Sequence, residues 1–255
     1  MNQIAIITGA SAGIGRATAL LLAGNGFDVV ITGRRAPHLE HLKEEIQSST
    51  HADVLPLAFD IRDQKAVESA VDTLSGKWKN VDVLVNNAGL AAGLNHIHDG
   101  ELSDWEQMID TNIKGLLYIT RLISPGMVER GSGHIINIGS IAGKEVYEKG
   151  NVYNATKFAV DGLTRAMRVD LVEHGIKVTS VNPGAVETEF SMVRFKGDSE
   201  KAEKVYDGFT PLRAEDVAEA ILFAVTRPPH VNIDDLTILA TAQASATKIA
   251  RKTLK

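Results

Sequence analysis

The sequence predicts an α/β fold: a single domain built on a doubly wound, Rossmann-type parallel β-sheet with helices on both faces. Two observations lead to this prediction. Short runs rich in Val and Ile alternate along the chain with longer segments in which apolar residues recur every three or four positions. A glycine-rich turn also joins the first apolar run to the first helical segment. A repeated strand, helix, strand order implies right-handed crossovers and therefore parallel strands.

The elements follow one another in a regular order. The apolar runs carry few charges, as strands buried on both faces do, and cover residues 4–8, 29–32, 54–58, 83–86, 134–138, 177–183 and 236–239. Helical spacing covers residues 15–24, 64–74, 105–128, 152–174 and 214–226. No repeat or linker interrupts this order, so residues 1–255 are predicted to form one domain. The least regular stretch, residues 187–209, follows the sixth strand and is a candidate substrate lid, because ligands bind at the carboxyl ends of such strands.

Composition excludes several classes of protein. The chain has 255 residues, 44% of them hydrophobic and 23% charged, and a net charge of −5, so nothing indicates a nucleic-acid partner. Cysteine is absent, which excludes disulfides, a thiolate nucleophile and a cysteine zinc site. The N-terminus enters an apolar strand at once, and no apolar run approaches the roughly 18 residues of a membrane span. We therefore expect a cytoplasmic protein with no membrane partner.

The turn after the first strand has the composition of a phosphate-binding site. Gly9, Gly13 and Gly15 are spaced G-x-x-x-G-x-G, and Ser11 adds a hydroxyl donor. Glycines allow a close approach of the backbone to a pyrophosphate, and the following helix offers free N–H groups. The alternative is an ordinary turn that uses glycine for packing, but its place after the first strand favours a dinucleotide cofactor.

The end of the second predicted strand indicates which dinucleotide binds. NAD-selective sites place an acidic residue there, on the ribose 2′-hydroxyl. Here the sequence is GRR, with Arg34 and Arg35 and no acid. Two guanidinium groups would pair with the 2′-phosphate of NADP, whereas the alternative is a solvated arginine pair. We predict NADP as the cofactor.

Three side chains suggest acid/base chemistry. Ser140 ends the fifth strand, and Tyr153 and Lys157 share one helix face four residues apart. An ammonium beside a phenol favours the phenolate and lowers its pKa, so that Tyr153 can exchange a proton with a carbonyl oxygen while Ser140 holds that oxygen. Taken singly, each residue also fits a bland role as a turn former, a packed tyrosine or a solvated lysine.

With these residues in place, the chain resembles the short-chain dehydrogenase/reductase family over nearly its whole length. The motifs appear in order as TGASAGIG at 8–15, NNAG at 86–89, Asn112 in DTNIKG, Ser140, YNATK at 153–157 and NPG at 182–184. The resemblance implies a catalytic set of Asn112, Ser140, Tyr153 and Lys157, in which Asn112 supports a water-linked proton relay to Lys157, and Lys157 also holds the nicotinamide ribose. It also implies a homotetramer formed through the helices at 105–128 and 152–174.

The same resemblance extends the cofactor site. Asp60 and Ile61 are expected to contact the adenine, Asn87 and Gly89 to line the cofactor path, and the segment after the sixth strand to embrace the nicotinamide and pyrophosphate. The full predicted set is Gly9, Ser11, Gly13, Ile14, Gly15, Arg34, Arg35, Asp60, Ile61, Asn87, Gly89, Tyr153, Lys157, Pro183, Gly184, Val186 and Thr188. One departure is Ala12, where many NADP-dependent members carry a basic residue, so the cofactor prediction rests on Arg34 and Arg35.

A finer resemblance indicates the substrate. The stretch ETEFSMVRFKGDSEKAEKVYDG looks like the NADP-dependent 3-hydroxy acid dehydrogenase branch, which acts on L-allo-threonine, L-serine and short 3-oxo acids. A small carboxylated substrate needs a cation or several donors, and Arg194 and Lys196 are the candidates; the alternative is two solvated charges on a mobile loop, or contacts at a subunit boundary. Another reductase of the family, for acyl-carrier esters, sugars or bulky ketones, and a non-catalytic NADP sensor are the competing functions. His96 and His98 precede Asp99 in a polar loop, and we predict no metal there.

Overall fold

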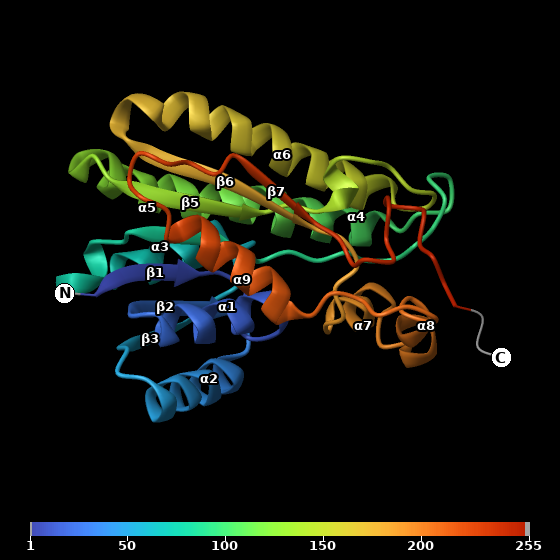
Figure 1. Ribbon diagram of the computed structural model, residues 1–255, viewed down its shortest axis with the longest axis horizontal. Coiled ribbons are helices and arrows are strands. Elements are labelled where there is room, and N and C mark those ends of the chain that lie inside the picture. The colour runs from blue at the N-terminus through green and yellow to red at the C-terminus, as the bar shows by residue number, and fades with distance from the viewer. Residues whose placement is uncertain (1, 253–255) are drawn as a thin grey trace.

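The computed structural model describes residues 2–252 and contains one sheet of seven parallel strands in the order β3-β2-β1-β4-β5-β6-β7 (Figure 1). The strands are β1 (Gln3–Ile7), β2 (Phe27–Gly33), β3 (Val54–Ala58), β4 (Val83–Asn86), β5 (Gly133–Ile138), β6 (Ile176–Pro183) and β7 (Asp235–Ile238). The order reverses between β1 and β4, which is where a doubly wound sheet opens a crevice for a ligand. The predicted fold class and all seven predicted strands are confirmed, with boundaries shifted by at most two residues.

Helices cover both faces of the sheet. They are α1 (Gly13–Gly24), α2 (Ala36–Ser49), α3 (Gln64–Asp72), α4 (Leu102–Ile109), α5 (Leu116–Arg130), α6 (Asn151–Leu171), α7 (Phe190–Arg194), α8 (Ser199–Lys204) and α9 (Ala214–Val225). Short helical turns are η1 (Gly76–Lys79), η2 (Asp110–Gly115), η3 (Ile141–Gly143) and η4 (Val172–His174). The stretch predicted as one helix at 105–128 begins earlier and passes through η2, which is a π-helix joining α4 to α5.

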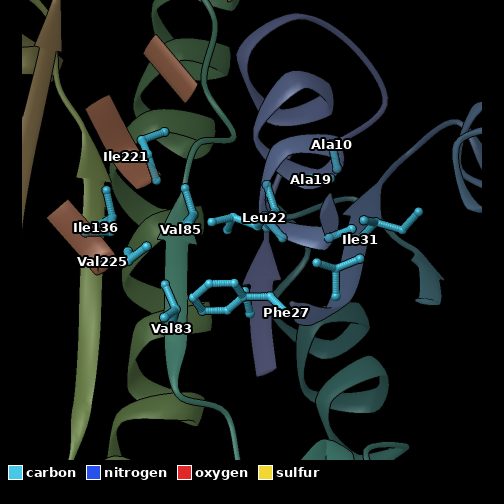
Figure 2. Close-up of a cluster of buried hydrophobic side chains, with 14 of the residues drawn as sticks. Ala10, Ala19, Leu22, Phe27, Ile31, Val83, Val85, Ile136, Ile221 and Val225 are labelled. Carbon is cyan, nitrogen blue, oxygen red and sulfur yellow. The ribbon is translucent and has the colours of Figure 1, made fainter. Parts of the chain in front are cut away.

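Alternation along each strand sends side chains into two cores. Ala5 and Ile7 of β1 belong to the core beneath α1, α2 and α9, where Leu22 and Ile221 lie (Figure 2). Their neighbours Ile4 and Ile6 belong to the core beneath α3, α5 and α6. This two-sided burial explains why the strands are continuous apolar runs.

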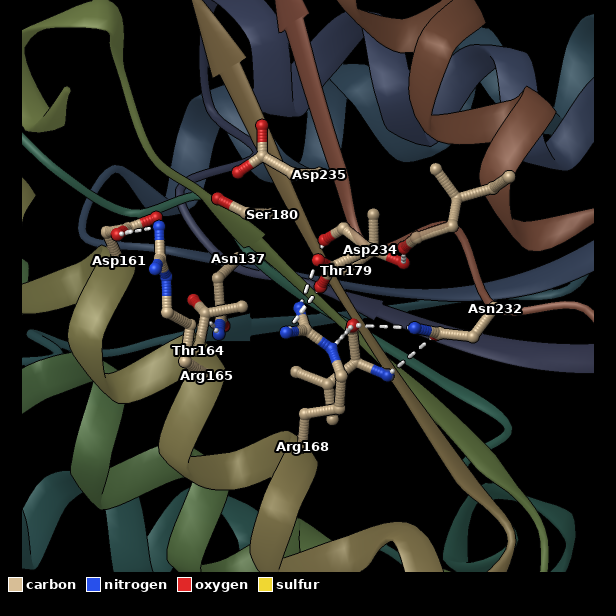
Figure 3. Close-up of polar contacts among 12 residues, drawn as sticks. Asn137, Asp161, Thr164, Arg165, Arg168, Thr179, Ser180, Asn232, Asp234 and Asp235 are labelled. Carbon is tan, nitrogen blue, oxygen red and sulfur yellow. Dashed lines mark hydrogen bonds and ion pairs between the residues drawn. The ribbon is translucent and has the colours of Figure 1, made fainter.

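The edge strand β7 is fastened to the rest of the sheet by side chains (Figure 3). Arg168 of α6 donates from Nε to the carbonyl of Val178 at 3.1 Å, and it pairs with Asp234 just before β7. The Asn232 side-chain oxygen accepts from the Val178 N–H at 3.1 Å. These contacts hold the C-terminal part of the chain against β6.

Residues 187–209 are more regular than predicted. They contain α7 and α8, and both ends of the segment are joined by main-chain hydrogen bonds between Glu187 and Leu212 and between Leu212 and Ala185. The two helices have only five and six residues, too short to show an apolar period in the sequence. No helix within residues 2–252 combines the length and the apolar character needed to cross a membrane.

Candidate active site

A cavity of about 280 Å³ lies at the carboxyl ends of the strands, beside the point where the strand order reverses. Every residue predicted to bind the cofactor lines this cavity except Gly15, and Ser140 lines it too. Asn112, Arg194 and Lys196 do not belong to its wall. Residues of the wall that the sequence reasoning did not single out include Arg62, Leu90, Glu189, Phe190 and Val193.

The glycine-rich turn has the shape that a bound phosphate needs. Gly9 and Gly13 have φ values of +67° and +50°, a region that favours glycine. A side chain at Gly15 would bring its Cβ to 2.4 Å from the amide nitrogen of Asn87, so this glycine packs the turn against β4 rather than facing the cavity. Helix α1 begins at Gly13 without a side-chain cap, which leaves its first N–H groups for a ligand.

The arginines at the end of β2 lie at the same cavity. Arg35 donates to the hydroxyl of Ser11 and forms a 3.0 Å ion pair with Glu189. Nearby, Arg62 binds both carboxylate oxygens of Asp60, at 2.6 Å and 3.0 Å, and this hydrogen bonding holds the pKa of Asp60 below its usual range. The cluster has the charge expected of a site for a phosphate group, with Asp60 neutralised by its partner.

Ser140, Tyr153 and Lys157 meet at the opposite end of the cavity. Ser140 follows β5, and its hydroxyl accepts from the Ala142 N–H at 3.1 Å. Tyr153 and Lys157 lie on the buried side of α6 and are 8% and 7% exposed. The Lys157 ammonium donates to the Ile138 carbonyl at 2.8 Å and lies 6.0 Å from the centre of the Tyr153 ring.

The electrostatics differ from the sequence-based expectation that Lys157 lowers the pKa of Tyr153. Burial raises the pKa of Tyr153 to about 12, and the groups that act in the opposite direction are Arg194 and Ser140. Burial also lowers the pKa of Lys157 to about 8. Desolvation is thus the largest effect on both groups, and the Lys157 ammonium is bound to the Ile138 carbonyl rather than to the Tyr153 hydroxyl.

Asn112 lies in the π-helix η2, a type of distortion that is frequent at functional sites. Its side-chain oxygen accepts from the Leu90 N–H at 2.8 Å, while its amide donates to the Leu90 carbonyl and to the Thr156 hydroxyl. The side chain therefore holds the loop after β4 against α6. A Cβ added at Gly89 would lie 3.3 Å from the Asn112 oxygen and 3.7 Å from Nζ of Lys157, so both groups approach the same point.

Arg194 and Lys196 have different surroundings. The Arg194 guanidinium carbon lies 5.2 Å from the centre of the Tyr153 ring, and one guanidinium nitrogen donates to the Tyr147 hydroxyl. The buried Nε of Arg194 has no hydrogen-bond partner among residues 2–252. Lys196 instead forms a 2.9 Å ion pair with Asp104 of α4, which holds its ammonium on α4 rather than at the cavity.

Two supporting residues carry no motif in the sequence. Tyr147 packs against Gly150 and receives the Arg194 hydrogen bond, and Gln243 accepts from the Ala185 N–H at 2.9 Å beneath the loop after β6. A Cβ at Gly184 would lie 2.2 Å from this Gln243 oxygen. The hydrogen-bond partners Arg194 and Ala185 lie 47 and 58 residues away from Tyr147 and Gln243 along the chain, so local spacing gave no signal for either residue.

The histidine pair in the loop before α4 is an exposed surface feature. The rings of His96 and His98 stack with their centres 5.6 Å apart, and His98 lies 3.1 Å from Asp99. Within residues 2–252, no three His, Asp or Glu side chains are grouped so that they could hold a metal ion.

The fold and the site together define a dinucleotide-binding oxidoreductase. The profile of the short chain dehydrogenase family matches residues 3–199, and the chain belongs to this family. It is 48% identical over 245 residues to the NADP-dependent 3-hydroxy acid dehydrogenase YdfG of Salmonella typhi, covering 96% of this chain and 97% of that protein. It is 44% identical over 245 residues to sulfoacetaldehyde reductase 2 of Chromohalobacter salexigens, covering 96% of each. Among solved structures, the closed form of serine dehydrogenase complexed with NADP+ matches with a TM-score of 0.92 at 44% identity, over 98% of this chain and 100% of that one.

Proposed function

We propose that this protein is an NADP-dependent oxidoreductase of short 3-hydroxy acids and the matching 3-oxo acids, with Tyr153 as its acid/base. The observation that carries the substrate class is the guanidinium of Arg194, which lies 5.2 Å from the Tyr153 ring centre and keeps a buried Nε without a partner. Arg194 is outside the wall of the main cavity but lines a second, smaller pocket together with Tyr153, where it can orient a carboxylate beside the reacting oxygen. The similarity to a 3-hydroxy acid dehydrogenase and to a serine dehydrogenase bound to NADP+ supports the same proposal.

We assign different roles to the residues along the cavity. Arg34 and Arg35 would bind the 2′-phosphate, and the N–H groups at the start of α1 would bind the pyrophosphate. The nicotinamide, when bound, supplies or accepts the hydride. Ser140 hydrogen-bonds the substrate oxygen, and Tyr153 gives that oxygen a proton or takes one away. Lys157 holds the ribose, and Asn112 supports the proton path behind it.

Substitution of Arg194 tests the substrate class. We expect Arg194→Ala to raise KM for L-serine and L-allo-threonine roughly ten- to hundredfold, because a charge-assisted hydrogen bond is lost. The measurement follows the ultraviolet absorbance of the reduced nicotinamide, with NADP and NAD compared. Tyr153→Phe, which keeps the ring packed against Phe190, should be inactive with every substrate.

The matched comparison is Lys196→Ala, which removes a cation two residues away that is bound to Asp104. We expect it to change KM far less than Arg194→Ala does. An equal effect of the two variants, or an unchanged KM in Arg194→Ala, would remove Arg194 as the carboxylate partner. Activity on bulky ketones or sugars but on none of the hydroxy acids would overturn the substrate class.

A sulfonated aldehyde is the second candidate substrate. The chain is 44% identical to a sulfoacetaldehyde reductase, and a sulfonate presents oxygens to a guanidinium much as a carboxylate does. The two classes separate in the same assay, because malonic semialdehyde and sulfoacetaldehyde can be compared at equal concentration with NADPH. The substrate with the larger kcat/KM identifies the class on which the enzyme acts.

We further propose a homotetramer assembled through α4, α5 and α6, and a cytoplasmic location. Large apolar side chains on the outer surface of these helices support the assembly, among them Leu117, Phe158 and Val169.

Residues 187–209 are proposed to act as the substrate lid. Their contacts with both ends of the cavity, through Glu189 and Arg194, support this role.

A further inference from the structure

Three arginines line the end of the cavity formed by β2 and β3, and they differ in their partners. Arg62 is bound to both oxygens of Asp60. Arg35 is bound to Ser11 and to Glu189. Arg34 forms no side-chain hydrogen bond or ion pair with any residue from 2 to 252, although it lines the same wall. One of the two arginines at the end of β2 is thus already paired with a carboxylate.

The partner of Arg35 comes from a distant part of the chain. Glu189 directly precedes α7 in the segment after β6, and its carboxylate lies 3.0 Å from a guanidinium nitrogen of Arg35. The two side chains are 40% and 55% exposed, so water and a ligand can reach the pair. Glu189 also lines the cavity, which places a negative charge where the proposed 2′-phosphate must bind.

We propose that Glu189 and the 2′-phosphate of NADP compete for Arg35, so that Glu189 limits the affinity for NADP without affecting NAD. This inference rests on the proposed function, in which Arg34 and Arg35 bind that phosphate. A carboxylate and a phosphate at one guanidinium repel each other, so the phosphate must displace Glu189 or bind less tightly. The ribose of NAD carries a neutral hydroxyl at this point and leaves the Arg35–Glu189 pair intact.

The position of Glu189 connects the two ends of the site. It directly precedes the five-residue helix α7, whose last residue is Arg194, the neighbour of Tyr153. Release of Glu189 by the phosphate therefore frees the first turn of the segment that carries the proposed carboxylate partner. An acidic residue at the start of α7 is in this sense a specificity-determining residue for the cofactor.

The test compares the dissociation constants of the protein for NADPH and NADH. Both are measured from the change in fluorescence of the reduced nucleotide when it binds to the protein. We expect Glu189→Gln to tighten NADPH binding roughly two- to fivefold, the value of an exposed ion pair, and to leave NADH binding unchanged. Glu187→Gln is the matched control, because it removes a charge two residues earlier whose side chain forms no ion pair within residues 2–252 and does not line the cavity. In an Arg35→Gln background the gain from Glu189→Gln should disappear.

Each other outcome overturns the inference. Unchanged or weaker NADPH binding in Glu189→Gln would mean that the carboxylate does not compete, or that it orients Arg35 for the phosphate. An equal gain for NADH, an equal gain in Glu187→Gln, or a gain that persists without Arg35 would indicate only a general change of charge. Failure of the proposed function looks different, since the wild-type protein itself would then bind NADPH no tighter than NADH.

Discussion

At the scale of single residues, the ammonium of Lys157 is a charge held in the protein interior. Its one protein partner among residues 2–252 is the carbonyl of Ile138, at 2.8 Å, and burial lowers its pKa to about 8. We predict that Lys157→Met removes activity but stabilises the cofactor-free protein by about 1–3 kcal/mol, because methionine fills a similar volume without a charge. Urea unfolding at neutral pH measures this difference.

The pH dependence of that gain follows from the sign of the shift. The pKa of Lys157 in the folded protein, about 8, is below its ordinary value of 10.5, so between these values the unfolded chain binds more protons. The free energy of unfolding of the wild-type protein therefore rises with pH between about 8 and 10.5, as far as Lys157 contributes to it. The advantage of Lys157→Met should be complete below about pH 8 and shrink toward pH 10.5. A variant less stable than the wild type at neutral pH would contradict the argument.

The residue scale also shows what spacing along a chain can predict. Tyr153 and Lys157 lie four residues apart, so their shared helix face followed from the sequence and is present in the structure. The cation nearer to the Tyr153 ring is Arg194, at 5.2 Å against 6.0 Å for Lys157. Arg194 comes from another helix, α7, and only the folded chain brings it beside Tyr153 near the N-terminal end of α6. The local sequence pattern therefore predicted that Tyr153 and Lys157 share a helix face. It did not predict which cation lies nearest to the Tyr153 ring.

At the scale of elements, the strands were predictable because burial on both faces forces continuous apolar runs. The helices within residues 187–209 were harder to predict, because they are short and are stabilised by contacts with other parts of the chain. One such contact comes from the C-terminal end: Arg251 donates to the carbonyls of Asp207 and Val205 and lies 5.2 Å from the Phe209 ring centre. Arg251 and Lys252, called the C-terminal strap here, thus contact residues 205–209 at the end of the proposed lid.

This strap gives a prediction for the segment that it holds. Arg251→Ala should speed amide hydrogen exchange across residues 205–209 by about two- to tenfold, because two hydrogen bonds and a ring contact are lost. Lys248→Ala is the matched control, since its side chain has no hydrogen bond or ion pair within residues 2–252. Equal exchange in both variants would show that the strap does not hold the lid.

At the scale of the whole molecule, the two cores on either side of the sheet bury most of the large apolar side chains. Several others remain exposed on one outer surface. Leu102, Ile109 and Leu117 recur at seven- and eight-residue spacing along α4, η2 and α5, and each is at least 36% exposed. On α6, Phe158 is 43% exposed and Val169 is 74% exposed. Helices α5 and α6 cover the same face of the sheet (Figure 1). A monomer would leave these rows in water, which favours association through this layer.

The proposed tetramer can be tested on that surface. We expect Phe158→Glu to dissociate the assembly into smaller species, because the new carboxylate would be buried in the interface without a partner. Ile97→Glu is the control: Ile97 is 62% exposed in the loop before α4, outside the helical rows, so its substitution should leave the assembly intact. Sedimentation velocity distinguishes the species, and circular dichroism confirms that both variants are folded. A wild-type protein that sediments as a monomer, or a Phe158→Glu variant that remains tetrameric, would mean that these apolar rows serve another partner or none.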